Sequence, residues 1–304
     1  MVDHLEGLLD ELRNFQEIAT TLKPSPGETP TLEGVEIGGV STPLKELVGG
    51  DHVVYIDFNR RYDLDRRVAQ ARREGQPDVA RRLERCRRRA GILVADVSGH
   101  KATDALVAAM LHQSFLLGVY YELDRFGEIT TKLFEHINQR FYRTTSVRKY
   151  LTMIYGEISQ EGRFRFISAG HQRPTIFSRE YGRFADISED RLVSYPPVGM
   201  MPSNADANEL VGPSALGYKK PYTVNEIDLL ANGDILLLYT DGLYEHGEGE
   251  FFPREVERLL AASGDLDAQT ICEALEAHLL DYADPVDDIS YVVVRKVPGA
   301  PPGA

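Results

Sequence analysis

The chain has 304 residues, of which 42% are hydrophobic and 27% charged, as in an ordinary globular protein of one large or two small domains. Its net charge of −13 argues against nucleic acid as the main partner, because phosphate backbones repel an acidic surface. Two cysteines are too few for a disulfide framework and the first residues hold no apolar signal core, so we expect a cytoplasmic protein.

Residues 2–22 are predicted to form an amphipathic helix, because apolar residues recur there at steps of three and four. Two prolines and a glycine within 23–27 end this pattern, so we expect residues 1–30 to be a helix and linker ahead of the main domain. The apolar stripe of such a helix needs a cover. It either docks on its own domain or pairs with a second copy in a homodimer.

Residues 31–298 are expected to form one domain, followed by a flexible tail over 299–304. Alternating apolar residues predict strands at 53–58, 92–95, 151–158, 164–168, 175–177, 235–239 and 289–294. Helical patterns lie at 102–123, 129–141, 253–262 and 268–282. Several strands follow one another through short polar turns, which favours antiparallel sheets with helices packed outside over a regular βαβ alternation.

The segment 60–90 interrupts this rhythm with twelve arginines against five acidic residues. It predicts two helices, over 61–74 and 78–89, inserted between two strands as a hairpin around Gly75 and Pro77. The hairpin is either a solvated pair that complements the acidic remainder of the surface or a docking arm for an acidic phosphoprotein. Aromatic residues are sparse in it, which disfavours nucleic-acid binding.

The longest uncharged run, 105–121, is shorter than the ~20 apolar residues that a membrane span needs. Polar residues also stand in its middle, at His112 and Gln113. We therefore predict a buried core helix and no membrane partner.

Four aspartate sites stand at the ends of apolar runs, beside glycine or a second carboxylate. They are Gly49-Gly50-Asp51, Ala95-Asp96-Val97-Ser98-Gly99-His100, Tyr239-Thr240-Asp241-Gly242 and Asp287-Asp288-Ile289. A lone Asp-Gly pair is usually a turn, and it is the joint pattern that indicates a site. Carboxylates gathered at one sheet edge repel one another unless cations neutralise them.

An all-oxygen ligand set suits Mg²⁺ or Mn²⁺, whereas zinc usually recruits histidine or cysteine. Two such ions ~3.5–4 Å apart can bridge a water molecule, lower its pKa and direct it at phosphorus. The residues themselves therefore indicate a phosphoester hydrolase.

An ordered set of six blocks resembles the SpoIIE/RsbU-like phosphatases, a bacterial branch of the PPM superfamily, over roughly residues 30 to 296. The blocks are Val48-Gly49-Gly50-Asp51, Ala95-Asp96-Val97-Ser98-Gly99-His100, Ala169-Gly170-His171, Pro197-Val198-Gly199, the run from Asn232 to Glu245, and Asp287-Asp288-Ile289-Ser290. This resemblance implies an α+β fold, an αββα sandwich of two antiparallel sheets flanked by helices.

The resemblance also implies a set of metal ligands for two divalent cations, Mn²⁺ or Mg²⁺. They are Asp51, Asp96, the carbonyl of Val97, Asp241 and Asp287, with Asp288 in a supporting role. Asp51, Asp96 and Asp241 would be the catalytic aspartates. A metal-bridging hydroxide would attack phosphoserine or phosphothreonine in line, without a phosphoenzyme.

The sequence departs from this family in two places. His52-Val53-Val54 follow Gly-Gly-Asp where Phe-Tyr-Asp is usual, so one supporting aspartate is lost, and Lys101 stands where glycine is common after Gly-His. Lys101 is either a solvated residue at a helix start or a charge offered to the substrate phosphate. His171 is either a general acid or substrate contact, or a histidine that hydrogen-bonds a loop.

The expected substrate is a small phosphorylated regulatory protein, of the kind that antagonises an anti-sigma factor. An alternative is a catalytically inactive regulator that keeps the fold and binds a phosphoprotein. The four aspartates weigh against this alternative, because a binding module need not keep a metal cage.

Overall fold

The structure is a computed structural model that describes residue 14 and residues 28–44, 49–98, 102–144, 150–203, 214–229 and 231–299. The predicted helix over 2–22 lies outside the described residues apart from Asn14, and the predicted tail lies outside them apart from Gly299. Lys101 is also outside them.

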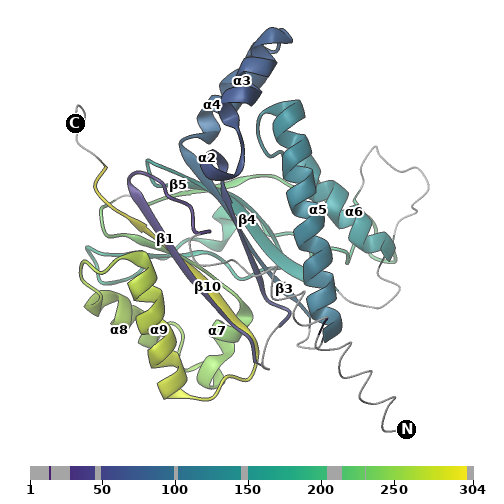
Figure 1. Cartoon of the computed structure of the whole chain (residues 1–304). Helices are drawn as coiled ribbons and strands as arrows, with labels where there is room; N and C mark the ends of the chain where they lie inside the picture. The colour runs from purple at the N-terminus through teal and green to yellow at the C-terminus, as the bar shows by residue number, and fades with distance from the viewer. Residues whose placement is uncertain are drawn as a thin grey trace.

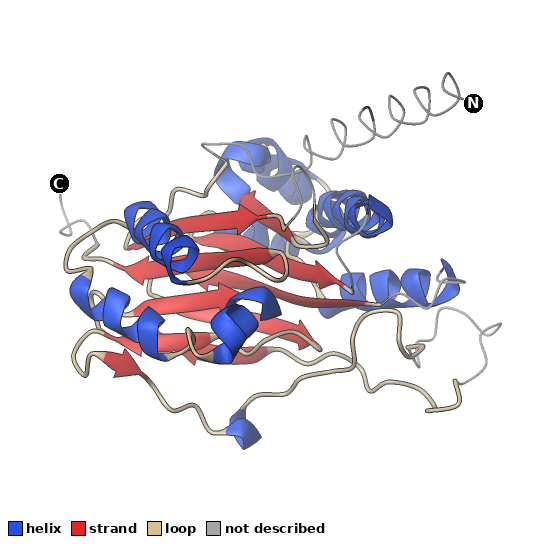
Figure 2. Ribbon diagram, turned by 90° about the horizontal axis from the view of Figure 1, so that it is seen from below, coloured by secondary structure: helices blue, strands red, loops and turns tan. Residues whose placement is uncertain are grey.

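Two antiparallel sheets of five strands each are stacked face to face (Figure 2). One sheet has the order β1-β10-β9-β6-β7 and the other, which we call the second sheet, has the order β2-β3-β4-β5-β8. The strands are β1 Val35–Thr42, β2 His52–Asp57, β3 Arg89–Val97, β4 Leu151–Ser159, β5 Arg163–Ala169, β6 Thr175–Ser178, β7 Arg183–Phe184, β8 Asn225–Asp228, β9 Ile235–Tyr239 and β10 Ile289–Lys296.

Helices cover the outer face of each sheet (Figure 1). The second sheet is covered by α3 Leu64–Arg73, α4 Pro77–Cys86, α5 Ala102–Phe126 and α6 Thr131–Thr144, and the first by α7 Asp241–Glu245, α8 Arg254–Ala262 and α9 Ala268–Tyr282. Short helices are α2 Phe58–Arg61, η1 Glu189–Arg191 and η2 His246–Gly249. The predicted αββα sandwich is confirmed.

The apolar core forms three layers that follow from this stacking. Residues such as Ile92, Ile154 and Val292 fill the space between the sheets. A second cluster packs the second sheet against α3 to α6, and a third packs the first sheet against α7 to α9. Successive side chains along each strand therefore pack alternately into the central layer and into one outer layer.

Strand β1 was not predicted, because the glycines Gly38 and Gly39 hide its alternating pattern. At both positions a neighbouring residue lies too close to leave room for a side chain. A Cβ atom on Gly38 would lie 2.6 Å from the backbone of Ala268 in α9, and one on Gly39 would lie 2.2 Å from the hydroxyl of Tyr55. Tertiary packing at these two positions outweighs the low strand propensity of glycine.

Helix α5 is buried on one face only, which narrows the prediction of a buried core helix. Its inner face is buried through residues such as Leu111 and Phe115, but Leu106, Leu117 and Tyr120 are 50%, 74% and 55% exposed. The stretch Asp104–Phe126 has a mean hydropathy of 1.2 and is long and apolar enough to cross a membrane. Core helices of soluble proteins can have the same length and composition. The absence of membrane contact stays a prediction.

The arginine hairpin, α3 and α4, is inserted between the end of β2 and the start of β3 (Figure 1). Its inner stripe is apolar, and Leu64, Val68, Leu83 and Cys86 are buried against the second sheet and its helices. Asp51 and Asp96 stand at the opposite end of the same two strands. The hairpin therefore lies at the far end of the second sheet from these aspartates.

We predict that Gly38→Ala lowers the free energy of unfolding by about 1–3 kcal/mol, the usual cost of overpacking, because the new methyl group meets the backbone of α9. Urea unfolding monitored by circular dichroism measures the change. Gly299→Ala, where a Cβ atom meets nothing within 4 Å, is the matched control and should be neutral. Equal stabilities of the two variants would contradict the close packing of α9 on β1.

Candidate active site

The four predicted aspartate sites lie at one end of the sandwich, which we call the aspartate end. Asp51 directly precedes β2 and Asp96 lies near the end of β3, so the antiparallel register makes them cross-strand neighbours. In the other sheet Asp241 follows β9 and Asp287 precedes β10, and these two strands also pair antiparallel. The topology thus brings together residues from four distant parts of the sequence.

One hydroxyl group joins the two sheets at this end. Thr240 Oγ1 donates to Asp51 Oδ2 at 2.7 Å and accepts from the backbone N–H of Ser290 at 3.0 Å. The backbone N–H of Thr240 in turn donates to the carbonyl of Ser290 at 2.9 Å. Thr240 and Ser290 are fully buried, so no solvent competes for these bonds. They fix Asp51 against the ends of β9 and β10.

Asp288 holds the segment that leads into β2. Its carboxylate accepts from the backbone N–H groups of Leu44 and Gly50, each at 2.7 Å. The side chain of Asp287 accepts from the backbone N–H of Asp288 at 2.8 Å. Because both carboxylate oxygens of Asp288 are engaged by the loop, it lies in a supporting position next to the other aspartates.

Two of the glycines in the sequence blocks are explained by Asp288. A Cβ atom on Gly49 would lie 2.2 Å from the carboxyl carbon of Asp288, and one on Gly242 would lie 2.0 Å from its carbonyl oxygen. Glycine is required at both positions so that the loop before β2, the start of α7 and the start of β10 can meet.

The carboxylates interact strongly. Burial, and then the charge of Asp96, raise the pKa of Asp51 well above its ordinary value. Burial raises the pKa of Asp96 to about 7, with Asp241, Asp287 and Asp288 adding to the effect. Burial and the neighbouring Asp287 also raise the pKa of Asp241. A cluster that resists ionisation in this way is a good acceptor for a cation.

The donor chemistry fits hard divalent cations. Asp51, Asp96, Asp241 and Asp287 offer carboxylate oxygens, and Val97 offers a backbone carbonyl beside Asp96. Among the described residues, no three side chains of His, Cys, Asp or Glu converge at metal-ligand distance. The aspartates are therefore neighbours by topology and electrostatics, and binding of ions would draw them closer together.

His171 lies beside this end of the sandwich but is buried, with 6% of its surface exposed. Its Nδ1 is 2.9 Å from Thr152 Oγ1, and Thr152 pairs with Asp96 across β3 and β4. Burial lowers the pKa of His171 to about 3. A neutral, buried imidazole favours the structural role over that of a general acid.

The structure also places residues that the sequence did not single out. Thr240 and Ser290 stand inside the blocks that carry the resemblance, yet only their pairing across β9 and β10 reveals that they hold Asp51. Thr152 carries no sequence signal of its own. Lys101, proposed as a substrate contact, lies outside the described residues.

Comparison with known proteins identifies the chain's relatives. The family model SpoIIE, described as Stage II sporulation protein E, matches residues 87–297. The phosphoserine phosphatase RsbP of Bacillus subtilis (strain 168) is 28% identical over 159 residues, which are 52% of this chain and 34% of RsbP. The chain thus spans about a third of the length of this curated relative.

Solved structures share the fold. The SiaA-PP2C domain of Pseudomonas aeruginosa superposes with a TM-score of 0.63 at 18% identity, covering 97% of this chain and 99% of that one. The RsbU and RsbW domains of Rv1364c from Mycobacterium tuberculosis give a TM-score of 0.59 at 20% identity, covering 90% and 62%. The predicted resemblance to this phosphatase family is confirmed.

We predict that Thr240→Val lowers the free energy of unfolding by about 1–3 kcal/mol, because it leaves the buried Asp51 and the N–H of Ser290 without their partner. Thr240→Ser keeps the hydroxyl group and should retain most of the stability. Urea unfolding of the three proteins checks this. Wild-type stability of Thr240→Val would contradict the role of the hydroxyl group, and a loss in Thr240→Ser as large as in Thr240→Val would show that the methyl group contributes as much as the hydroxyl.

The raised pKa of Asp96 predicts a pH dependence of the metal-free protein. The folded value of about 7 exceeds the unfolded value of ~3.9, so the stabilising protonated form is lost as the pH rises towards 7. In EDTA, Asp96→Asn should therefore gain about 2 kcal/mol relative to wild type between pH 5.5 and 8.

Comparing wild type with Asp96→Asn cancels the contribution of His171, whose lowered pKa acts with the opposite sign in both proteins, and leaves that of Asp96 together with its effect on Asp51. Unfolding free energies from urea titrations at several pH values provide the measurement. Saturating Mn²⁺ should remove the wild-type loss at pH 8. A pH-independent difference would contradict the raised pKa of Asp96.

Proposed function

Because the chain belongs to the SpoIIE family, whose members are PP2C-type serine/threonine phosphatases, we propose that it is a metal-dependent protein phosphatase that hydrolyses phosphoserine or phosphothreonine. The observation that carries the proposal is the convergence of Asp51, Asp96 and Asp241, with raised pKa values, at one end of the sandwich. A family of metal-dependent hydrolases and a cluster of carboxylates that needs a counter-charge support the same conclusion.

Asp51, Asp96, the carbonyl of Val97, Asp241 and Asp287 are the residues that would hold two divalent cations, Mn²⁺ or Mg²⁺. When bound, such ions supply a water molecule of lowered pKa as nucleophile and neutralise charge on the phosphoryl group.

The chain's own residues prepare this site. Thr240 orients Asp51 through a buried hydrogen bond, and Asp288 anchors the loop from which Asp51 extends. The buried imidazole of His171, whose pKa burial lowers to about 3, argues against a role as proton donor. The leaving serine or threonine oxygen would then take its proton from solvent. Positioning and electrostatics therefore account for the chain's contribution.

The proposed substrate is a small phosphorylated regulatory protein, such as an antagonist of an anti-sigma factor. The relative RsbP is named a phosphoserine phosphatase, which supports a phosphoserine side chain as the target. Contact of Lys101 with the phosphate, a homodimer through residues 2–22 and a cytoplasmic location stay predictions. The alternative of an inactive phosphoprotein-binding regulator does not explain the aspartate cluster, because a protein that only binds a phosphoprotein does not need metal ligands.

We predict that the protein hydrolyses p-nitrophenyl phosphate and a phosphothreonine peptide with Mn²⁺ or Mg²⁺ but not with EDTA. Asp241→Asn should lower the rate at least ~100-fold, because loss of a metal ligand costs more than the 10–100-fold typical of residues that only support one. Initial rates measured at matched metal concentration provide the test.

Asp281→Asn, an exposed change of the same type in α9, is the matched control and should keep wild-type rates. Circular dichroism confirms that both variants are folded. A folded wild-type protein without turnover in either metal, but with retained binding of a phosphopeptide, would favour the inactive regulator.

A further inference from the structure

Two adjoining hollows lie on the second sheet, at the end where β3 begins and β4 ends. They share the residues Arg89, Glu157 and Arg165. These residues come from β3, β4 and β5, and Glu157 pairs directly with Arg165 across β4 and β5. The aspartate end lies at the other end of the same strands. The hollows are therefore remote from the proposed active site.

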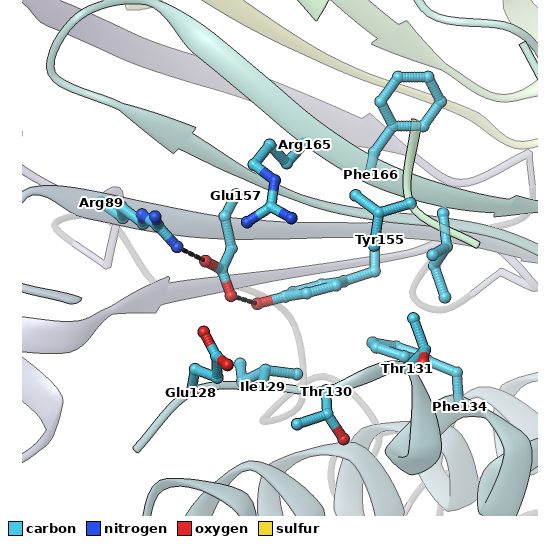
Figure 3. A pocket seen from close by; sticks show the side chains of 12 residues that line it. Arg89, Glu128, Ile129, Thr130, Thr131, Phe134, Tyr155, Glu157, Arg165 and Phe166 are labelled. Atoms are coloured by element: carbon cyan, nitrogen blue, oxygen red, sulfur yellow. Dashed lines mark hydrogen bonds and ion pairs between the residues drawn. The ribbon is translucent and has the colours of Figure 1, made fainter. Parts of the chain in front are cut away.

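The first hollow, which we call the apolar hollow, has a volume of about 180 Å³. This is the space of about six water molecules. Ile129, Phe134 and Val224 are among the residues that form its apolar walls. Its polar floor is Glu157, which accepts from Arg89 Nη1 at 3.2 Å and from the hydroxyl of Tyr155 at 3.1 Å (Figure 3).

The carboxylate of Glu157 is mostly buried, with 12% of its side chain exposed. Burial raises its pKa, and Arg89 opposes the rise. Gly91, which pairs with Glu157, leaves room for the hydroxyl of Tyr155, since a Cβ atom there would lie 3.0 Å from it. Arg165 points toward the same carboxylate (Figure 3). The floor is thus a built polar network.

The second hollow, which we call the basic hollow, has a volume of about 310 Å³. Its lining holds five arginines and two glutamates: Arg85, Arg88, Arg89, Arg163, Arg165, Glu157 and Glu161. In a chain with a net charge of −13, this is a local excess of positive charge. Part of this charge comes from Arg85 and Arg88 at the base of the arginine hairpin. The hairpin therefore contributes to a surface that lies away from the proposed phosphatase site.

Three of these arginines already pair with carboxylates: Arg88 with Glu161, Arg89 with Glu157 and Arg163 with Asp228. The other two are less engaged. Arg85 makes no ion pair with any residue that the structure describes. Arg165 contacts Glu226 at 3.5 Å, and both side chains are more than 40% exposed, at 44% and 46%. Exposed ion pairs of this kind contribute little and rearrange readily. The guanidinium groups of Arg85 and Arg165 are therefore available to an incoming anion, which they can bind through paired hydrogen bonds.

We propose that the two hollows form a binding site for a nucleoside phosphate, with the phosphate in the basic hollow and the base in the apolar hollow. A phosphate satisfies the surplus of arginines, and a planar ring suits the narrow apolar space beside it. The floor formed by Glu157 offers carboxylate oxygens that accept from the N–H groups of a base. Together the two hollows reach the size of ordinary ligand pockets, ~300 Å³ and above, which the apolar hollow alone does not.

Isothermal titration of the full chain with GMP, AMP and pyrophosphate tests the site, with EDTA present so that no metal at the aspartate end can capture phosphate. We expect GMP or AMP to bind at least ~10-fold more tightly than pyrophosphate. Arg85→Ala combined with Arg165→Ala should weaken this binding at least ~10-fold for each arginine removed, since hydrogen bonds to charged groups are strong.

Arg81→Ala combined with Arg183→Ala is the matched control, because it removes the same charge from exposed positions outside both hollows. It should bind the nucleotide as the wild type does. Absence of binding at millimolar GMP and AMP, equal affinity for pyrophosphate, or equal affinity in the two double variants would each overturn the proposal. Since EDTA abolishes metal-dependent hydrolysis, this result is independent of the phosphatase activity.

Discussion

Carboxylates from both sheets are gathered at one end of the sandwich, where their charges repel one another and burial disfavours their ionised forms. Burial raises the pKa of Asp51, and that of Asp96 to about 7. Keeping these carboxylates ionised therefore costs free energy, which apolar residues at the same positions would not. Local structure offsets part of this cost through the hydroxyl group of Thr240 and the backbone donors that hold Asp288. The rest is left for a cation to neutralise.

This arrangement depends on the two sheets ending at the same place. Asp51 belongs to one sheet and Thr240 to the other, and their hydrogen bond is buried. Gly49 and Gly242 let the connecting segments approach within contact of Asp288. The sandwich therefore sets where the aspartates lie, at the ends of paired strands. Such preorganisation is what a site based on electrostatic stabilisation requires.

Much of the fold could be predicted from the sequence, because the central strands are short, mostly apolar runs bounded by turns and the main helices are long apolar or amphipathic segments. The strand at 235–239 and the helix at 268–282 have the predicted bounds. Strand β1 could not be predicted, because its glycines are required by close contacts with α9 and Tyr55, which are distant in sequence. The exposed face of α5 was missed for a related reason: uncharged composition does not tell which residues find a partner.

The candidate site divides in the same way. Aspartates at the ends of apolar runs are visible in sequence, because strand ends are local features. The partners of these aspartates are not, since the hydrogen bond from Thr240 to Asp51 joins residues 189 positions apart. The burial of a side chain also cannot be read from the sequence, and it is burial that keeps the imidazole of His171 neutral. The sequence therefore predicts which groups do chemistry better than it predicts what holds them.

The separation between the two ends of the second sheet also bears on how the molecule is organised. Arg89 and Asp96 lie seven residues apart on β3, which at ~3.3 Å per residue places them more than ~20 Å apart. A ligand in the basic hollow therefore cannot take part in phosphoryl transfer at the aspartate end. Strands β3 and β4, which are paired along their length, connect the two ends directly. The arginine hairpin thus adds a second surface to a phosphatase fold, at the end of the second sheet that is remote from the aspartates.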